Sequence, residues 1–304
     1  MRLGRHMPTN SKPIKAAEIA RQIGCDAIQI FASNPMAWRP TADDPMGCAA
    51  FAQAARERDL DPVVIHAPYL INLASPDDVM WEKSISLLSW TLQRGALLSA
   101  EYVVFHIGSH KSSGIEAGIA RIVQALARIQ VPPGVMPLLE NDVGAGNSLG
   151  GSFERIGAVL DQLSEYSVDI GGNSPGGRNE LSSYTGTLGV CLDTAHLWGA
   201  GYDISRVDST EQVLQRFDEA IGLSRLKVIH LNDTAMALGS HRDVHARLGE
   251  GIIGEEGLRA LLCDPRLSHV AVLLETPIMT DADGKEDWEH DKQHLEKARN
   301  LMRK

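Results

Sequence analysis

Two residues in the last third of the chain, Asp243 and His245, have the types and the spacing of a metal site. They follow an apolar run that begins at Val228 and ends on His230, and the loop continues to the glycine-rich segment 249–251. A carboxylate and an imidazole one residue apart in an extended loop can turn toward the same ion, and these ligands suit zinc, manganese or iron. The stretch therefore predicts a metal centre.

Residues of the same kind close other apolar runs. Together with the first three they make nine candidate ligands: His66, His106, Glu140, Asp193, His196, His230, Asp243, His245 and Glu275. One zinc ion takes only three or four protein ligands, so the set predicts two or three ions. Clustered divalent ions suit phosphoryl transfer, because they generate a hydroxide near neutral pH and stabilise charge on the phosphate and the leaving oxygen.

The elements that must position these residues can be read from the apolar pattern. Short apolar runs alternate with segments of helical periodicity, which predicts a (β/α)8 TIM barrel that forms a single domain over residues 1–304. The predicted strands are 2–6, 27–31, 62–66, 102–106, 135–140, 188–193, 226–230 and 270–275. The predicted helices are 14–23, 44–59, 77–98, 115–129, 152–163, 209–221, 255–262 and 287–302. The active site of such a barrel lies at the carboxyl ends of its strands, where strands three to eight end on candidate ligands.

Each candidate taken alone has a simpler explanation. A single histidine at a strand end is more often a hydrogen-bonded structural residue, and a single Asp or Glu often caps the next helix. Six such residues at successive strand ends favour metal binding, because charged groups near a barrel core are costly unless they are paired or bound to metal. His6 and His110 lie at the same end and are candidates either for orienting ligands or for structural roles. The remaining histidines are assigned to solvated surface or loop positions: His241, His269, His290 and His294.

Bulk properties indicate a globular protein with 43% hydrophobic residues and no apolar window long enough to span a bilayer. The first residues lack the apolar core of a signal peptide, and four scattered cysteines fit reduced thiols, so a cytoplasmic location is expected. The net charge of −10 argues against general affinity for nucleic acid. Three divalent ions would offset six of these charges, so the net charge decides little.

With these residues in view, the sequence resembles the endonuclease IV family, the zinc-dependent abasic-site endonucleases also called AP endonuclease family 2. The resemblance runs from the third predicted strand to the eighth and covers most of the barrel. The matching segments are 66–73, 105–110, 139–141, 191–196, 201–203, 230–233, 239–245, 248–251 and 274–276.

The resemblance implies three zinc ions, with manganese or iron able to replace zinc at some sites. His66, His106 and Glu140 would bind the first ion. Glu140 would bridge to a second ion held by Asp193, His230 and Glu275, and His196, Asp243 and His245 would bind a third. The family cleaves double-stranded DNA on the 5′ side of an abasic site, leaving a 3′-hydroxyl and a 5′-deoxyribose phosphate. A metal-bridging hydroxide would be the nucleophile, which makes Glu140 the central catalytic residue.

The loops expected to meet DNA depart from the family pattern. Tyr69 and Asn34 match family positions at the DNA surface, whereas Met36 stands where a bulky Arg or Gln is usual and could still wedge into the duplex. Asp142 replaces a threonine, and residues 164–187 look like an insertion that leaves the barrel at the end away from the metals. Candidates for phosphate contact are Arg5, Lys12, Lys111, Arg242 and Arg247.

Three alternatives remain open. One is a sugar isomerase or epimerase of the xylose-isomerase-like barrels, although such an enzyme would not need the third site built from His196, Asp243 and His245. Another is a phosphoesterase of the same fold with a different substrate. The last is a non-catalytic binder of damaged DNA or of another phosphate ligand. A duplex needs an open barrel face, so a monomer without an obligate protein partner is expected.

Overall fold

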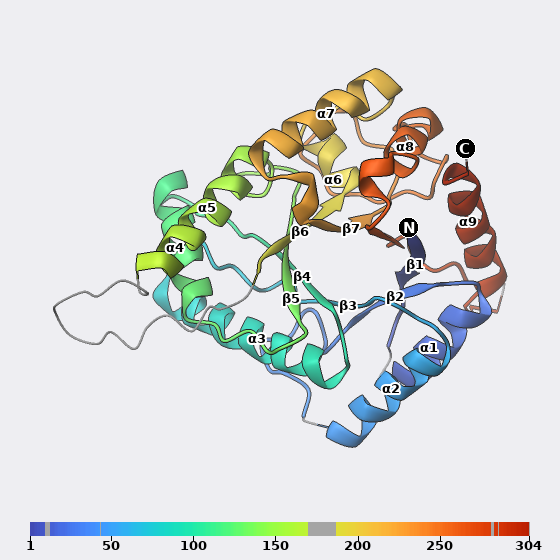
Figure 1. The fold of residues 1–304 in the computed structure, drawn as a ribbon, viewed down its shortest axis with the longest axis horizontal. Coiled ribbons are helices and arrows are strands. Elements are labelled where there is room, and N and C mark those ends of the chain that lie inside the picture. Colours follow the sequence, from blue (N-terminus) through green and yellow to red (C-terminus); the bar gives the residue numbers. More distant parts are fainter. Residues whose placement is uncertain (10–12, 43, 170–186, 281–282, 285, 304) are drawn as a thin grey trace.

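In the computed structural model, eight parallel strands form a closed barrel with helices around its outside (Figure 1). Each strand pairs with its neighbour in the sequence, and β8 pairs with β1 to close the ring. The strands are β1 (Arg2–His6), β2 (Ala27–Phe31), β3 (Val63–His66), β4 (Tyr102–His106), β5 (Met136–Glu140), β6 (Gly189–Asp193), β7 (Leu226–His230) and β8 (Ala271–Leu274). The predicted TIM-barrel fold is confirmed.

The structure describes residues 1–9, 13–42, 44–169, 187–280, 283–284 and 286–303, without the side chains of 166–169. The helices in this part are α1 (Pro13–Gln22), α2 (Pro45–Glu57), α3 (Asp78–Leu97), α4 (Ile115–Ala127), α5 (Phe153–Asp169), α6 (Thr194–Gly199), α7 (Val207–Ala220), α8 (Glu255–Leu262) and α9 (Trp288–Leu301). Two short 3-10 turns are η1 (Leu223–Arg225) and η2 (Pro265–Leu267). Over the described ranges, none of these helices has the length and the apolar character needed to cross a membrane.

Two helical segments differ from the prediction. Helix α5 continues to Asp169, past its predicted end at Leu163, so residues 164–169 of the predicted insertion 164–187 are helical. Residues 170–186 of that segment lie outside the described residues. Helix α6 was predicted as loop, because a six-residue helix is too short to show a periodic apolar pattern. Asp193 begins it, and its carboxylate accepts a 2.7 Å hydrogen bond from the backbone N–H of His196.

The barrel interior holds an apolar layer just below a polar one. The apolar layer consists of Ala27, Val64, Val104, Leu138, Cys191, Val228 and Leu273, one residue from each of β2 to β8. Successive side chains on a strand face opposite sides, so the residue two positions further on also faces inward. From β3 to β8 that residue is a predicted ligand, and on β2 it is Gln29. Strand alternation alone therefore brings these polar side chains to one mouth.

Strand β1 contributes to the mouth differently. A Cβ atom at Gly4 would lie 1.9 Å from the carbonyl oxygen of Ala27, so only glycine fits at this inward position. The next inward residue is His6, and Arg5 between them faces the outer helices. Arg5 is 1% exposed and forms an ion pair with Asp291 of α9. The prediction that Arg5 contacts phosphate at the mouth is therefore wrong, since its guanidinium is buried under a helix.

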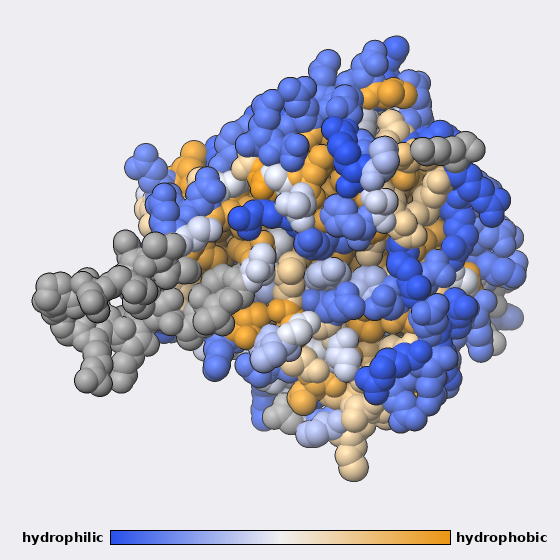
Figure 2. All heavy atoms as spheres, in the orientation of Figure 1, coloured by the Kyte–Doolittle hydropathy of each residue, from blue (hydrophilic) through white to orange (hydrophobic). Residues whose placement is uncertain are grey.

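The larger core lies between the strands and the surrounding helices. It includes Phe51 of α2, Phe153 of α5 and Phe217 of α7, all fully buried. The outward sides of the helices are mostly hydrophilic on the face shown in Figure 2, where apolar residues form only small areas. The ends of the chain lie close to each other beside β1 and α9 (Figure 1).

Candidate metal centre at the mouth of the barrel

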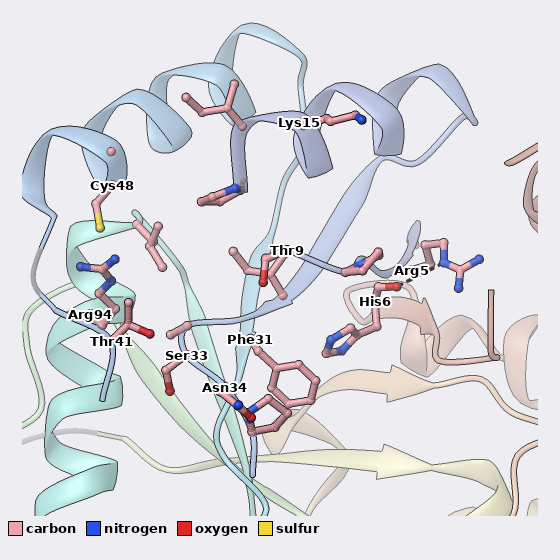
Figure 3. Close-up of a pocket in the computed structure, with 18 of the residues that line it drawn as sticks. Arg5, His6, Thr9, Lys15, Phe31, Ser33, Asn34, Thr41, Cys48 and Arg94 are labelled. Atoms are coloured by element: carbon pink, nitrogen blue, oxygen red, sulfur yellow. Dashed lines mark hydrogen bonds between the residues drawn. The ribbon is translucent and has the colours of Figure 1, made fainter. Parts of the chain in front are cut away.

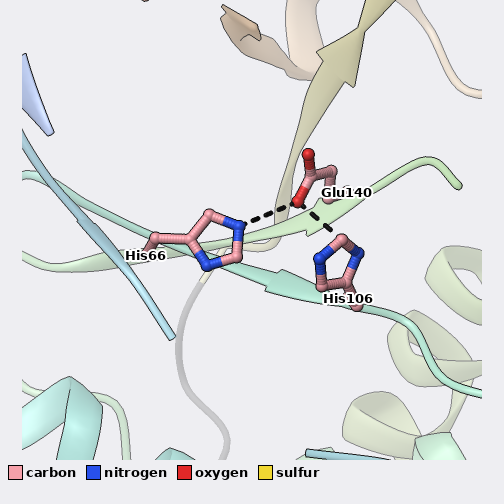
Figure 4. A group of neighbouring side chains, drawn as sticks. All are labelled: His66, His106 and Glu140. Atoms are coloured by element: carbon pink, nitrogen blue, oxygen red, sulfur yellow. Dashed lines mark hydrogen bonds and ion pairs between the residues drawn. The ribbon is translucent and has the colours of Figure 1, made fainter. Parts of the chain in front are cut away.

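Glu140 lies at the centre of the mouth and contacts histidines from several strands. Its Oε2 is 3.2 Å from His66 Nε2 and 3.6 Å from His106 Nδ1 (Figure 4). Its other oxygen, Oε1, is 2.8 Å from His230 Nδ1. The two oxygens of one carboxylate therefore face two different groups of side chains, as a bridging ligand requires.

A second set of contacts surrounds Asp243, which follows β7. Its Oδ1 lies 3.3 Å from His196 Nε2 and 3.2 Å from His245 Nε2. Asp193 joins this set, with Oδ2 3.5 Å from the same nitrogen of His245. Glu275 completes the network, with Oε2 3.1 Å from His230 Nδ1. His196 Nδ1 lies 3.7 Å from Glu140 Oε1 and links the two sets, so all nine predicted ligands lie in one connected network.

Within this network, three groups have ligand atoms that all lie within 4.8 Å of one another. They are His66 with His106 and Glu140; Glu140 with Asp193, His230 and Glu275; and Asp193 with His196 and His245. The first two are the ligand sets that the family resemblance implied. The third contains Asp193, and Asp243 reaches both of its histidines. Cys191 also approaches Glu140 and His230, but burial raises the pKa of its thiol to about 12, so it stays protonated at neutral pH.

The buried charges in the centre shift one another's proton affinities. Burial alone would raise the pKa of Glu140, but His106 and His230 hold it well below its usual range. Burial alone would lower the pKa of His245, but Asp193, Asp243 and Glu275 together raise it to about 9. Against the same effect of burial, Asp193, Asp243 and Glu140 raise the pKa of His196, and Cys191, Glu275 and Glu140 raise the pKa of His230. The centre is therefore a compact set of ionised carboxylates that require positive charge nearby.

The donor set fits divalent transition metals. His66 Nδ1 donates a 2.7 Å hydrogen bond to the carbonyl oxygen of Ala67, and His196 Nδ1 donates a 2.9 Å bond to that of Asn141. With Nδ1 protonated in each ring, the lone pair of Nε2 faces the carboxylates, which is the usual arrangement of metal-binding imidazoles. His245 Nε2 is buried and faces the carboxylates of Asp193 and Asp243, so a metal ion between these groups could bind it.

Three buried amides support the candidate ligands, and sequence reasoning assigned none of them this role. Gln29 is fully buried; its Oε1 accepts a 2.9 Å hydrogen bond from His230 Nε2, and its Nε2 donates a 2.6 Å bond to Glu275. Asn232 Nδ2 donates a 2.6 Å bond to Asp193. The side chain of Asn141 donates a hydrogen bond to the carbonyl oxygen of Asp193 and accepts one from its backbone N–H. Gln29 could have been recognised from the sequence, because it is a polar residue in an apolar strand and lies two positions after the inward-facing Ala27.

The two further histidines predicted near the ligands have different positions. His6 Nδ1 lies 3.8 Å from Glu275 Oε1 and 2.9 Å from Gln29 Nε2, so His6 belongs to the rim of the centre. His110 lies apart, because its Nδ1 accepts a 3.1 Å hydrogen bond from the backbone N–H of Gly114 at the start of α4. That contact gives His110 a local role in its loop, and none of its contacts described here supports the prediction that it orients a ligand.

The residues predicted to meet DNA lie on loops at the rim. Met36 is 68% exposed and Tyr69 is 51% exposed. The two loops are joined, because the backbone N–H of Tyr69 donates a hydrogen bond to the carbonyl oxygen of Pro35. Asn34 accepts a bond from the backbone N–H of Met36, which fixes the tip of the loop after β2. The ring of Tyr69 packs 5.4 Å from that of His66, so this rim is continuous with the centre.

The charged rim residues have separate surroundings. Arg242 and Lys111 are exposed, Arg247 donates a 2.7 Å hydrogen bond to the carbonyl oxygen of Pro277, and Lys12 lies outside the described residues. Asp142 accepts hydrogen bonds from the backbone of Gly144 and Gly150 and from Ser148. Its carboxylate therefore fixes the loop after β5 rather than adding a free charge at the mouth.

A cavity of about 1200 Å³ adjoins the centre on the side of β1 and β2. His6, Tyr69, His245 and Glu275 line it at the centre, and Lys15 of α1 and Arg94 of α3 line it further out. Figure 3 shows Arg94 across this cavity from His6, and Lys15 on the helix above it. The cavity thus leads from the candidate ligands to two cationic side chains.

Known proteins are similar to this chain in both sequence and fold. The family model for xylose isomerase-like TIM barrels matches residues 17–298. The probable endonuclease 4 of Natranaerobius thermophilus is 42% identical over 279 residues, covering 91% of this chain and 92% of its own. That of Chloroflexus aggregans is 37% identical over 308 residues, covering 99% and 98% of the two chains.

Solved structures with a similar fold include a protein of the same kind as these relatives. Endonuclease IV from Thermus thermophilus superposes with a TM-score of 0.80 at 34% identity, over 99% of each chain. A D-psicose 3-epimerase reaches a TM-score of 0.68 at 16% identity over 99% of each chain, which shows only that the fold is shared. The chain therefore belongs to the endonuclease IV family of xylose isomerase-like TIM barrels.

Proposed function

We propose that this chain hydrolyses the phosphodiester bond on the 5′ side of abasic sites in double-stranded DNA, using three zinc ions at the mouth of the barrel. The observation that carries the proposal is the single network of nine ligand-type side chains. Eight of them form three groups around Glu140 and Asp193, and Asp243 contacts the two histidines of the third group. We further propose that it acts as a monomer in the cytoplasm, since a duplex needs the mouth open.

Zinc ions, when bound, supply a nucleophile at neutral pH and neutralise charge on the phosphate and the leaving oxygen. The chain's own residues would hold and orient them. Glu140 suits a bridging role because its two oxygens face the His66 and His230 sides separately. His196, Asp243 and His245 would complete the third site, with Asp243 the most solvent-exposed of these ligands.

The rim suits a damaged duplex. An enzyme that works on one nucleotide must extrude it from the stack, and the gap is filled by a side chain. Met36 is the most exposed large apolar side chain of the rim loops, and an apolar wedge at this position would fill such a gap. Tyr69, packed on His66, would lie between the wedge and the ions, and Arg242 and Asn34 would contact the backbone.

The test is incision of a duplex that carries one synthetic abasic site, with zinc-loaded protein and with protein stripped by EDTA. We expect cleavage on the 5′ side only with metal, and about three ions per chain. Glu140→Gln should abolish turnover while the fold remains, because it removes one charged oxygen from a bridging ligand. Glu116→Gln, the same change at an exposed position on α4, is the control and should keep wild-type activity.

The outcomes separate the alternatives. Three ions without cleavage would move the proposal to another phosphoester, and tight binding of abasic DNA without incision would favour a binding protein. One or two ions without cleavage would favour a sugar isomerase or epimerase. Near-normal activity of Glu140→Gln would contradict a shared, bridging carboxylate.

A further inference from the structure

A second cluster of ligand-type side chains lies outside the barrel mouth, between α9 and the loop after β7. It consists of Glu250, His290 and His294, whose ligand atoms all lie within 4.8 Å of one another. We call it the α9 cluster. His290 and His294 are four residues apart on α9, so they share one face of the helix, and their ring centroids are 5.1 Å apart. Two histidines at this spacing on a helix can hold one metal ion.

One ring nitrogen of each histidine in this cluster has no hydrogen-bond partner in the described part of the chain. His294 is only 8% exposed, and its buried Nδ1 has no hydrogen-bond partner. His290 Nε2 is also buried and unpartnered. Burying a polar nitrogen without a partner is unfavourable, and a bound cation would remove that cost for both rings. The assignment of these two histidines to the solvated surface is therefore wrong for His294.

Glu250 is held in place by the loop that carries it. Asp233 is fully buried, and its carboxylate accepts hydrogen bonds from the backbone N–H groups of Gly249, Gly251 and Ile253 at 3.0, 3.1 and 3.1 Å. A Cβ atom at Gly251 would lie 2.2 Å from that carboxylate, so the loop can pass this close only with glycine there. Glu250 stands between the two glycines, and the loop presents it to α9.

We propose that Glu250, His290 and His294 form a binding site for one further divalent transition-metal ion of the zinc class, separate from the centre at the barrel mouth. Two imidazoles and one carboxylate are a common zinc ligand set, with water completing the tetrahedron. The site joins the first turns of α9 to the loop that carries Asp243 and His245. A bound ion there would tie that loop to the helix.

The charges around the α9 cluster are compatible with a cation. Burial, together with the positive charges of Arg247, His290 and Lys297, lowers the pKa of His294 to about 4, so its ring is neutral and able to coordinate metal at neutral pH. Arg247 and Lys297 have oxygen partners of their own. Arg247 bonds the carbonyl oxygen of Pro277, and Lys297 Nζ lies 3.0 Å from Glu255.

The test counts ions in the full-length protein. Wild type and variants are stripped with chelator, reloaded with zinc, passed through a desalting column, and measured for zinc and for protein. We expect His290→Ala to retain one zinc ion fewer per chain than wild type, and Glu250→Gln, which alters only an exposed side chain, to lose the same ion. His269→Asn is the control, because it removes a histidine bonded to Leu226 at the opposite end of β7.

A second readout is thermal unfolding. Zinc should raise the melting temperature of wild type and His269→Asn by more than that of the two cluster variants, since the ion binds only the folded arrangement. Equal zinc content in wild type and both cluster variants would overturn the proposal. The inference does not depend on the proposed function: a barrel mouth that bound no zinc would lower the count equally in every variant and leave the difference of one ion.

Discussion

Replacing Gln29 by leucine tests whether buried amides beneath the candidate ligands tune the metal centre. Gln29 makes three polar contacts: 2.9 Å to His230 Nε2, 2.6 Å to Glu275 Oε1 and 2.9 Å to His6 Nδ1. Leucine has a similar volume and would remove all three without opening a cavity. The ring of His230 and the carboxylate of Glu275 would then lose the partners that set their orientation.

Two lines of reasoning give the size of the effect. A hydrogen bond to a charged group such as Glu275 contributes about 1.5–3 kcal/mol. Loss of a partner that orients a metal ligand typically weakens metal binding about 10–100-fold, which corresponds to about 1.4–2.7 kcal/mol. Both estimates are near 2 kcal/mol, so Gln29→Leu should weaken zinc binding at the Glu140–Glu275 group about 30-fold.

The assay is competition for zinc between the protein and a chromophoric chelator of known affinity. Gln53→Leu is the matched control, because Gln53 is exposed on α2 and its side chain bonds Glu57, one turn further along the helix. Circular dichroism would establish that both variants fold. Zinc affinity of folded Gln29→Leu within threefold of the control would refute the reasoning, and would mean that His230 and Glu275 are held by the strands alone.

Three further perturbations follow from the structure. Asp291→Ala should destabilise the protein by about 3–5 kcal/mol in urea unfolding, because it leaves the buried guanidinium of Arg5 unpaired; a loss below about 1 kcal/mol would contradict this. Met36→Ala should raise the Kd for an abasic duplex about tenfold in fluorescence anisotropy, matching about 1.5 kcal/mol for an apolar wedge, and equal affinities would exclude the wedge. Arg216 lowers the pKa of Glu154 to about 2 from its ordinary value of 4.5. The ion pair therefore stabilises the fold fully at pH values above 4.5, and this contribution is lost as the pH falls toward 2. The gap in melting temperature between wild type and Arg216→Gln should therefore be small, as for any exposed pair, and should shrink between about pH 5 and pH 3.

Much of the fold could be predicted because the strands are short apolar runs with polar ends. β7 and α8 begin and end at the predicted residues, and the other strands differ by no more than a residue at either end. The candidate ligands could also be predicted from the sequence. The ligand on each strand is the last inward residue, and parallel strands end at the same face of the barrel.

What the sequence did not predict depends on which side of an element a polar residue faces. Arg5 immediately precedes the inward His6, so alternation directs it to the outer helices, where Asp291 pairs with it. His294 lies on the same face of α9 as the buried Leu295, Ala298 and Leu301. Its polarity suggested the surface, but the helical period of the apolar residues required burial. For Arg5 the partner, Asp291, lies far away in the sequence, and no local pattern reveals it.

The acidic composition and the proposed polyanionic substrate are compatible once charge is considered locally. The candidate centre contains four carboxylates, Glu140, Asp193, Asp243 and Glu275, and these already raise the pKa values of His196, His230 and His245. Divalent ions would satisfy the same negative charge in place of those protons. Three of them would leave the mouth with two positive charges, on a chain whose formal charge is −10. Attraction for phosphate would then be confined to the mouth, and an undamaged duplex that cannot bring a phosphate to the ions would meet mainly a repulsive surface.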